Sequence, residues 1–374
     1  VAKIRSLTTL QLTVRRDVNV MDLRYLEDLS LLESLKIVQV GDHVAVPNKR
    51  NVFHEPKSVT AARTREANAL PKLRHLEVRA NGLVQALVAS VVCPRQLELL
   101  KLEVPKDANG QHVLFMMNIL SVYFWRNVHL KTVVASAAKA ILPSFSAEDL
   151  GLTNMRDLEH VYGSVEGFLK DVGRLGEVKV FELEGIPFFQ DTSVDEFVEA
   201  LGPLRNLREL RFLPMHTATL TMPSMEVLNG VRKNSPKLRK LAILVDLEDE
   251  IPAVPSDFSP SAHPLETLSI FTEEYFQFRE METARTIKIA KYIDRMFPRV
   301  VSLTAEDEGR LERSTLGPAR TQWDREFWEE VEVLVKSLCQ DVRKQTLVDK
   351  KKERKKGRDR GDKKKKGKKL KGME

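Results

Sequence analysis

One apolar pattern recurs along most of the chain and restricts the folds open to it. The pattern is L-x-x-L-x-L, with Ile, Val or Phe in place of some leucines, and clear copies begin at Leu7, Leu32, Leu73, Leu97, Val178, Leu207, Leu238 and Leu265. Weaker copies begin at Leu130, Leu158 and Val300. The mean spacing is about 29 residues, and self-similarity at such a period predicts stacked repeats.

Each copy is typical of a short strand, because the fourth and sixth positions are two residues apart and share one face. The segments between copies are predicted helices. The clearest, Asp195 to Leu201, starts after the capping box Ser193-x-x-Glu196 and ends at Gly202 and Pro203. Proline stops the helix ahead of five strands, at Pro71, Pro94, Pro236, Pro264 and Pro298.

A strand–helix unit of this kind cannot bury its own apolar face, so successive units must stack. We therefore predict an α/β leucine-rich-repeat solenoid over residues 1–312. It is expected to be a right-handed horseshoe with parallel strands on the concave face and helices outside. Only the copy at Leu73 extends to the longer consensus, with Asn81 and Leu83 in place. Residues 41–68 and 246–260 are predicted rim insertions.

Two further segments are expected after the solenoid. Residues 313–348 predict a capping helix whose apolar side carries Trp323, Phe327, Val331, Leu334, Leu338 and Val342, with a partner-binding helix as the alternative. Residues 349–374 form a predicted disordered tail. From residue 350 onward there are 15 Lys/Arg against 4 Asp/Glu, so the net charge of +7 hides a mildly acidic folded part.

Cysteine content and hydropathy predict an intracellular protein of the nucleus or cytoplasm. Cys93 and Cys339 form no C-x-x-C pair, and no N-x-S/T sequon is present, which favours a reduced compartment with buried thiols. The longest apolar run, from Val113 to Trp125, is shorter than the ~18 residues of a membrane helix. Because a strand pattern starts at Ile4, we expect natural sequence upstream of Val1.

No catalytic chemistry is predicted. The eight histidines lack H-x-x-x-H spacing, and no phosphate-binding glycine loop or G-x-S-x-G elbow occurs. The acidic run at 246–250 lacks the alternating spacing of a calcium loop. We therefore expect no enzyme activity, no cofactor, no metal and no small-molecule ligand.

A protein partner is instead expected on the concave face, where the residues between and beside the two core positions of each strand are exposed. The candidates are Thr9, Gln11, Thr13, Ser34, Lys36, His75, Glu77, Arg79, Lys101, Glu103, Glu182, Glu184, Glu209, Arg211, Lys240, Thr267, Ser269 and Phe271. Mixed charge with few aromatic residues favours a polar protein partner over a nucleic acid. The alternative for any one of them is a merely soluble strand residue.

The basic tail has three interpretations: a nuclear import signal, a contact to nucleic acid, or a solubilising extension. Its basic residues include Lys350, Lys351, Lys352, Arg354, Lys355, Lys356, Lys363, Lys364, Lys365, Lys366, Lys368 and Lys369.

Strands such as LPKLRHLEV, SPKLRKLAI and HPLETLSI, in repeats without a regular asparagine, resemble the degenerate leucine-rich repeats of fungal F-box proteins over residues 4–305. The resemblance implies that the repeats present a substrate to a cullin-based ubiquitin ligase, whose adaptor binds an N-terminal F-box. No F-box is found in this chain, so adaptor binding is expected only if one lies upstream of residue 1. The alternative function is a scaffold or regulator without ligase contact that acts in the nucleus.

Overall fold

The computed structural model describes residues 6–14, 25–40, 70–92, 94–105, 116–137, 165–187, 194–215, 223–247, 250–253, 263–271, 283–304 and 326–337. Its central feature is one ten-stranded sheet in which the spatial order of the strands is their order along the chain. Every neighbouring pair is parallel. The strands are β1 (Thr9–Val14), β2 (Ser34–Gln39), β3 (His75–Arg79), β4 (Leu99–Val104), β5 (Thr132–Ala137), β6 (Val180–Pro187), β7 (Glu209–Met215), β8 (Lys240–Leu244), β9 (Thr267–Phe271) and β10 (Ser302–Thr304).

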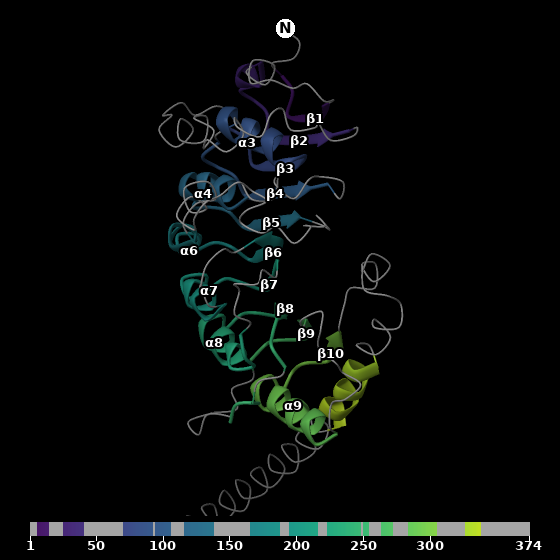
Figure 1. Cartoon of the computed structure of the whole chain (residues 1–374). Helices are drawn as coiled ribbons and strands as arrows, with labels where there is room; N and C mark the ends of the chain where they lie inside the picture. Colours follow the sequence, from purple (N-terminus) through teal and green to yellow (C-terminus); the bar gives the residue numbers. More distant parts are fainter. Residues whose placement is uncertain are drawn as a thin grey trace, which may run out of the picture.

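The labelled helices lie along one side of this sheet (Figure 1). The described helices between strands are the 3-10 helix η1 (Tyr25–Asp28) and the α-helices α3 (Gly82–Val91), α4 (Met116–Arg126), α6 (Val165–Val172), α7 (Val194–Ala200), α8 (Val227–Asn234) and α9 (Thr283–Met296). Parallel neighbours need a crossover connection between them, and a described helix occurs in each of these connections except those from β2 to β3 and from β8 to β9. The result is a solenoid-like α/β fold.

The predicted apolar positions form continuous rows through the core. In the strand register Leu76 lies beside Leu35 and Leu100, and the row continues to Leu241 and Leu268. All five are at most 2% exposed. The first leucine of the pattern is equally buried at Leu73, Leu97, Leu207 and Leu238, each at 0%. At the N-terminal edge, Leu10 and Leu12 of β1 are only partly buried against this core.

Aromatic rings join the helices to the sheet in the middle of the stack. Phe124 of α4 lies 5.8 Å from Phe168 of α6 and 6.2 Å from Phe181 of β6, measured between ring centroids. All three are at most 1% exposed. Next to this cluster Gly185 has φ +65, and a Cβ there would lie 2.6 Å from the carbonyl oxygen of Ala137. Only glycine fits that approach between β5 and β6.

Buried polar side chains satisfy the backbone where the helices begin and end. Asn81 caps α3, since its Oδ1 accepts from the Val84 amide at 3.0 Å while its own amide donates to Gln39 Oε1 at 2.8 Å. Asn127, 0% exposed, follows α4; its Oδ1 accepts from the Leu97 amide and its Nδ2 donates to the Tyr123 carbonyl. These buried hydrogen bonds join neighbouring repeat units.

Buried ionisable groups show the low polarity of the interior. Burial lowers the pKa of His263, whose Nε2 lies 3.0 Å from the Ser235 carbonyl oxygen. Burial likewise raises the pKa of Tyr292 to about 12. Both groups are therefore neutral at pH 7 and belong to the packed core of the C-terminal half.

The α/β class and the parallel strands agree with the sequence analysis, and α7 begins and ends one residue earlier than the predicted helix. Several predictions lie outside the described residues: the copy at Leu158, Ser193 of the capping box, the insertion at 41–68, most of the loop at 246–260, both cysteines and the basic tail. Within the predicted capping segment, residues 326–337 are helical and bury Phe327, Trp328, Val331 and Val335. Glu332 Oε2 accepts from the Leu303 amide of β10 at 2.7 Å.

Candidate functional site: the open face and the strand-start column

The side of the sheet away from the helices carries the predicted partner-binding residues, and we call it the open face. Its central row holds the residue between the two core positions of each strand: Gln11, Lys36, Glu77, Lys101, Val134, Glu182, Arg211, Ala242, Ser269 and Thr304. Flanking rows contain the remaining candidates, Thr9, Thr13, Ser34, His75, Arg79, Glu103, Glu184, Glu209, Lys240, Thr267 and Phe271. Each of these candidates is exposed or half-buried. Strand register therefore brings together residues from separate units.

Opposite charges on neighbouring strands pair across the open face. Lys36 Nζ lies 3.2 Å from Glu77 Oε2, and Arg79 Nε lies 3.4 Å from Glu103 Oε1. Further along, Lys240 Nζ lies 3.2 Å from Glu209 Oε1. Exposed pairs of this kind contribute only about 0–1 kcal/mol each, so they order the side chains more than they stabilise the fold.

Arg211 is the most enclosed of the ion-paired cations Lys36, Arg79, Arg211 and Lys240 on the open face. Its side chain is 16% exposed, its Nε lies 3.4 Å from Glu184 Oε2, and its Cζ lies 5.4 Å from the centroid of the Phe271 ring. A guanidinium held between a carboxylate and an aromatic face has a fixed direction. In the same row Val134 and Ala242 carry no charge, so charged positions are interrupted by apolar ones.

A second charged array, which sequence reasoning missed, lies just ahead of the strands. We call it the strand-start column: Glu33, Arg74, Glu98, Lys131, Lys179, Arg208, Arg239 and Glu266. Each carbonyl oxygen in it accepts two amides of the next unit; the Arg74 oxygen, for example, accepts from Glu98 and Leu99. This repeated bond fixes the column in register. The signal was present in the sequence as the residue after the first leucine of each copy, which aligned copies would have revealed.

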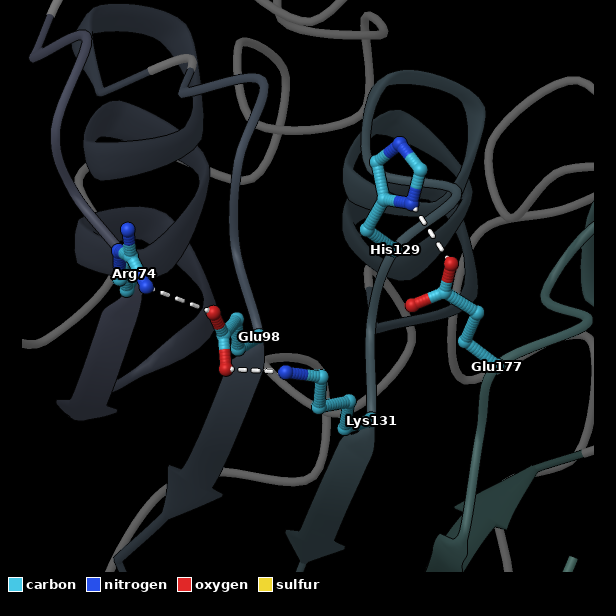
Figure 2. Close-up of polar contacts among 5 residues, drawn as sticks. All are labelled: Arg74, Glu98, His129, Lys131 and Glu177. Atoms are coloured by element: carbon cyan, nitrogen blue, oxygen red, sulfur yellow. Dashed lines mark hydrogen bonds and ion pairs between the residues drawn. The ribbon is translucent and has the colours of Figure 1, made fainter. Parts of the chain in front are cut away.

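In the first half of the column, charges alternate and pair. Glu98 bridges two cations from the neighbouring units: Arg74 Nη1 donates to its Oε1 at 3.1 Å, and Lys131 Nζ donates to its Oε2 at 2.7 Å. Figure 2 shows these three side chains in line ahead of their strands, with His129 Nδ1 and Glu177 Oε1, 2.9 Å apart, in the adjacent loops. The hydrogen bond from Lys131, with the positive charges of Lys131 and Arg74, holds the pKa of Glu98 below its usual value.

We expect Glu98→Gln to lower the free energy of unfolding by less than about 1 kcal/mol at pH 7, because Glu98 is partly exposed and solvent screens its pairs. Since the folded-state pKa lies below the unfolded value of 4.5, the contribution is present above pH 4.5 and is lost as pH falls through the folded pKa. Urea unfolding of both proteins at several pH values measures it. Glu266→Gln is the control, since Glu266 has no ion pair with a described residue. A difference that persists at the lowest pH would contradict the assignment.

Other kinds of site are not seen in the part of the chain that the structure describes. Its residues include no group of three or more His, Cys, Asp or Glu side chains placed to hold a metal ion. None of the described helices is long and apolar enough to cross a membrane. The arrangement offers fixed charges on a rigid sheet.

Comparison with known proteins assigns no family, since no family model and no curated protein matches this sequence.

Proposed function

We propose that this chain is a leucine-rich-repeat protein without enzymatic activity, and that it is the substrate-recognition part of an F-box-type adaptor of a cullin-based ubiquitin ligase. Its working surface is the open face, which binds a protein partner. The adaptor role follows the resemblance of the repeated strands to those of fungal F-box proteins, and it requires an F-box upstream of residue 1.

One observation carries the binding proposal: charged side chains from many strands are held in register on the side of the sheet away from α3, α4, α6, α7 and α8. The strands are joined to their neighbours on both sides, so the backbone beneath Lys36, Glu77 and Arg211 is fixed before a partner arrives. Preorganised groups lose little conformational entropy on binding. A rigid surface of this kind suits recognition of another folded or extended protein.

The chemistry of the open face favours a partner of mixed charge. Acidic and basic residues alternate over β2, β3 and β4, and Arg211 sits beside the aromatic ring of Phe271. Electrostatic complementarity of this kind sets specificity and the rate of association more than raw affinity. Single-stranded nucleic acid would need a continuous basic row with stacking rings, which the described strands lack.

The test exchanges the two charges within an ion pair. The sheet keeps its ion pairs, while the charge pattern that it presents to the partner is reversed. Lys36→Glu with Glu77→Lys, and Arg79→Glu with Glu103→Arg, are introduced into the full protein. We expect thermal unfolding to change little and the partners recovered by affinity capture from the native cell to be lost. Partner recovery equal to that of the wild type would contradict binding through the open face.

The same capture separates the adaptor from a scaffold. If the full natural protein is a ligase adaptor, the cullin and its adaptor subunit are recovered with both the wild type and the exchanged variant, because the F-box is a separate segment. Accumulation of the captured partners when the protein is depleted supports their role as substrates. Absence of cullin from both captures would overturn the ligase role and leave a scaffold or regulator acting in the nucleus.

A further inference from the structure

The second half of the strand-start column breaks the charge alternation of the first half. After Glu98, the column reads Lys131, Lys179, Arg208 and Arg239 on four consecutive units before Glu266 restores an acid. Amide bonds to the preceding carbonyl oxygen place each residue directly beside the next. With adjacent strands about 4.8 Å apart, the four cations extend over about 14 Å.

Unlike Lys131, which pairs with Glu98, the other three cations lack the partners that described cations have elsewhere on the sheet. Lys179, Arg208 and Arg239 are exposed, and none has an ion pair with a described residue. On the open face, by contrast, Lys36, Arg79, Arg211 and Lys240 each lie beside a carboxylate. Like charges directly opposite each other on adjacent strands lower stability. Repulsion among these cations therefore lowers the stability of the fold, and an anionic partner would relieve that repulsion.

The surroundings of the column add positive charge and define its limits. Arg205 and Lys237 are exposed in the turns that lead into β7 and β8, and Lys237 Nζ donates to Asn206 Oδ1 at 2.9 Å. Glu98, which pairs with Lys131, and Glu266, which follows Arg239, flank the run, and Glu177 lies two residues before Lys179. The positive region is thus short and narrow, with acids at both ends.

We propose that Lys179, Arg208 and Arg239 bind an acidic segment of a partner polypeptide that runs across the strands. In an extended peptide, alternate side chains face the same way about 6.6–6.8 Å apart, so three carboxylates extend over about 13 Å, close to the length of about 14 Å from Lys131 to Arg239. Nucleic-acid binding is favoured by a longer basic stripe with several stacking rings, whereas the exposed ring of Trp125 in the neighbouring helix already lies 5.9 Å from Arg174 Cζ. The inference rests on the proposal that the solenoid binds protein, but it uses a surface separate from the open face.

The probe is a fluorescent (Glu-Ser)6 peptide, and its binding to the full chain is followed by anisotropy at low and physiological salt. The column variant is Lys179→Glu, Arg208→Glu and Arg239→Glu. The control variant, Lys72→Glu, Lys170→Glu and Lys291→Glu, alters three exposed lysines elsewhere and changes the net charge equally. The basic tail is the same in all proteins. A Gln version of the column variant, free of new acids, replaces the Glu version if the latter fails to fold.

We expect the column variants to weaken peptide binding at least about tenfold, and the control variant to weaken it less than about twofold, since fixed local charges outweigh net charge. Carbodiimide coupling of the peptide should join its carboxylates to Lys179 in preference to Lys72. The Gln variant should unfold at the same temperature as the wild type or a higher one, because repulsion is removed.

Three results would overturn the proposal: equal weakening by the column and control variants, coupling confined to lysines of the tail, or loss of oligo-uridine binding in the column variant with peptide binding unchanged. The last would assign the column to nucleic acid. None of these results bears on the charge-exchange test of the open face, so failure of the two proposals is distinguishable.

Discussion

Leu100→Ala should lower the free energy of unfolding by about 3–5 kcal/mol, because its side chain is 0% exposed and lies between Leu76 of β3 and Val133 of β5. Removing three heavy atoms there leaves a cavity between two layers of the stack. Neighbouring strands are hydrogen-bonded on both sides and cannot close it fully. Urea unfolding followed by circular dichroism measures the loss.

The control is a Leu→Ala substitution at another strand of the same register row. Leu10 occupies the equivalent position on β1 at the edge of the sheet, where it is only partly buried. Leu10→Ala should therefore cost about 1–2 kcal/mol, since less apolar area returns to water. Equal losses at the two positions would contradict a core that is continuous through the middle of the stack.

Asn127→Ala should lower the free energy of unfolding by about 2–4 kcal/mol, although it removes no apolar contact of the size of a leucine. Asn127 is 0% exposed, and its Oδ1 accepts the amide proton of Leu97 at 3.0 Å. Truncation leaves that buried amide without a partner. The Tyr123 carbonyl loses the Nδ2 donor but keeps the amide of residue 127.

Asn206 is the matched control because it also lies in a turn ahead of a strand. Its Nδ2 donates to the Gly176 carbonyl at 3.2 Å and its Oδ1 accepts from Lys237, but these bonds are exposed to solvent. Water can replace them, so Asn206→Ala should change stability by less than about 1 kcal/mol. Thermal unfolding of both variants compares the two. A larger loss at Asn206 would show that the exposed turn, and not the buried amide, determines the stability of this junction.

The strand pattern could be predicted from the sequence because its chemical signal is periodic. Leu76, Leu100 and Leu241 fall at the same place in each copy, and alternation along a strand puts them on one face. The open-face candidates follow from the same alternation, since a residue between two core positions must face the other way. The partner those residues recognise, and the ligase role, stay predictions.

The weak copies were harder to interpret. β5 is built from Thr132 to Ala137 with Val133 and Ala135 as its core residues, both 0% exposed, although neither is a leucine. In the strand register Val133 lies beside Phe181 of β6, whose ring centroid is 6.2 Å from that of Phe124. In the C-terminal helix, Trp328 is 2% exposed and Val335 is 1% exposed, yet the amphipathic pattern had placed neither on the apolar side.

The sequence by itself determined the repeating unit, the parallel α/β class and the rows of buried leucines, because these depend on contacts between positions of fixed spacing. Only the tertiary structure decided which charges meet. Glu98 lies 24 residues from Arg74 and 33 from Lys131, and the pairing of all three depends on the loops that set the register between units. Register likewise places Lys179, Arg208 and Arg239 side by side, which only an alignment of separate copies of the repeat could have suggested.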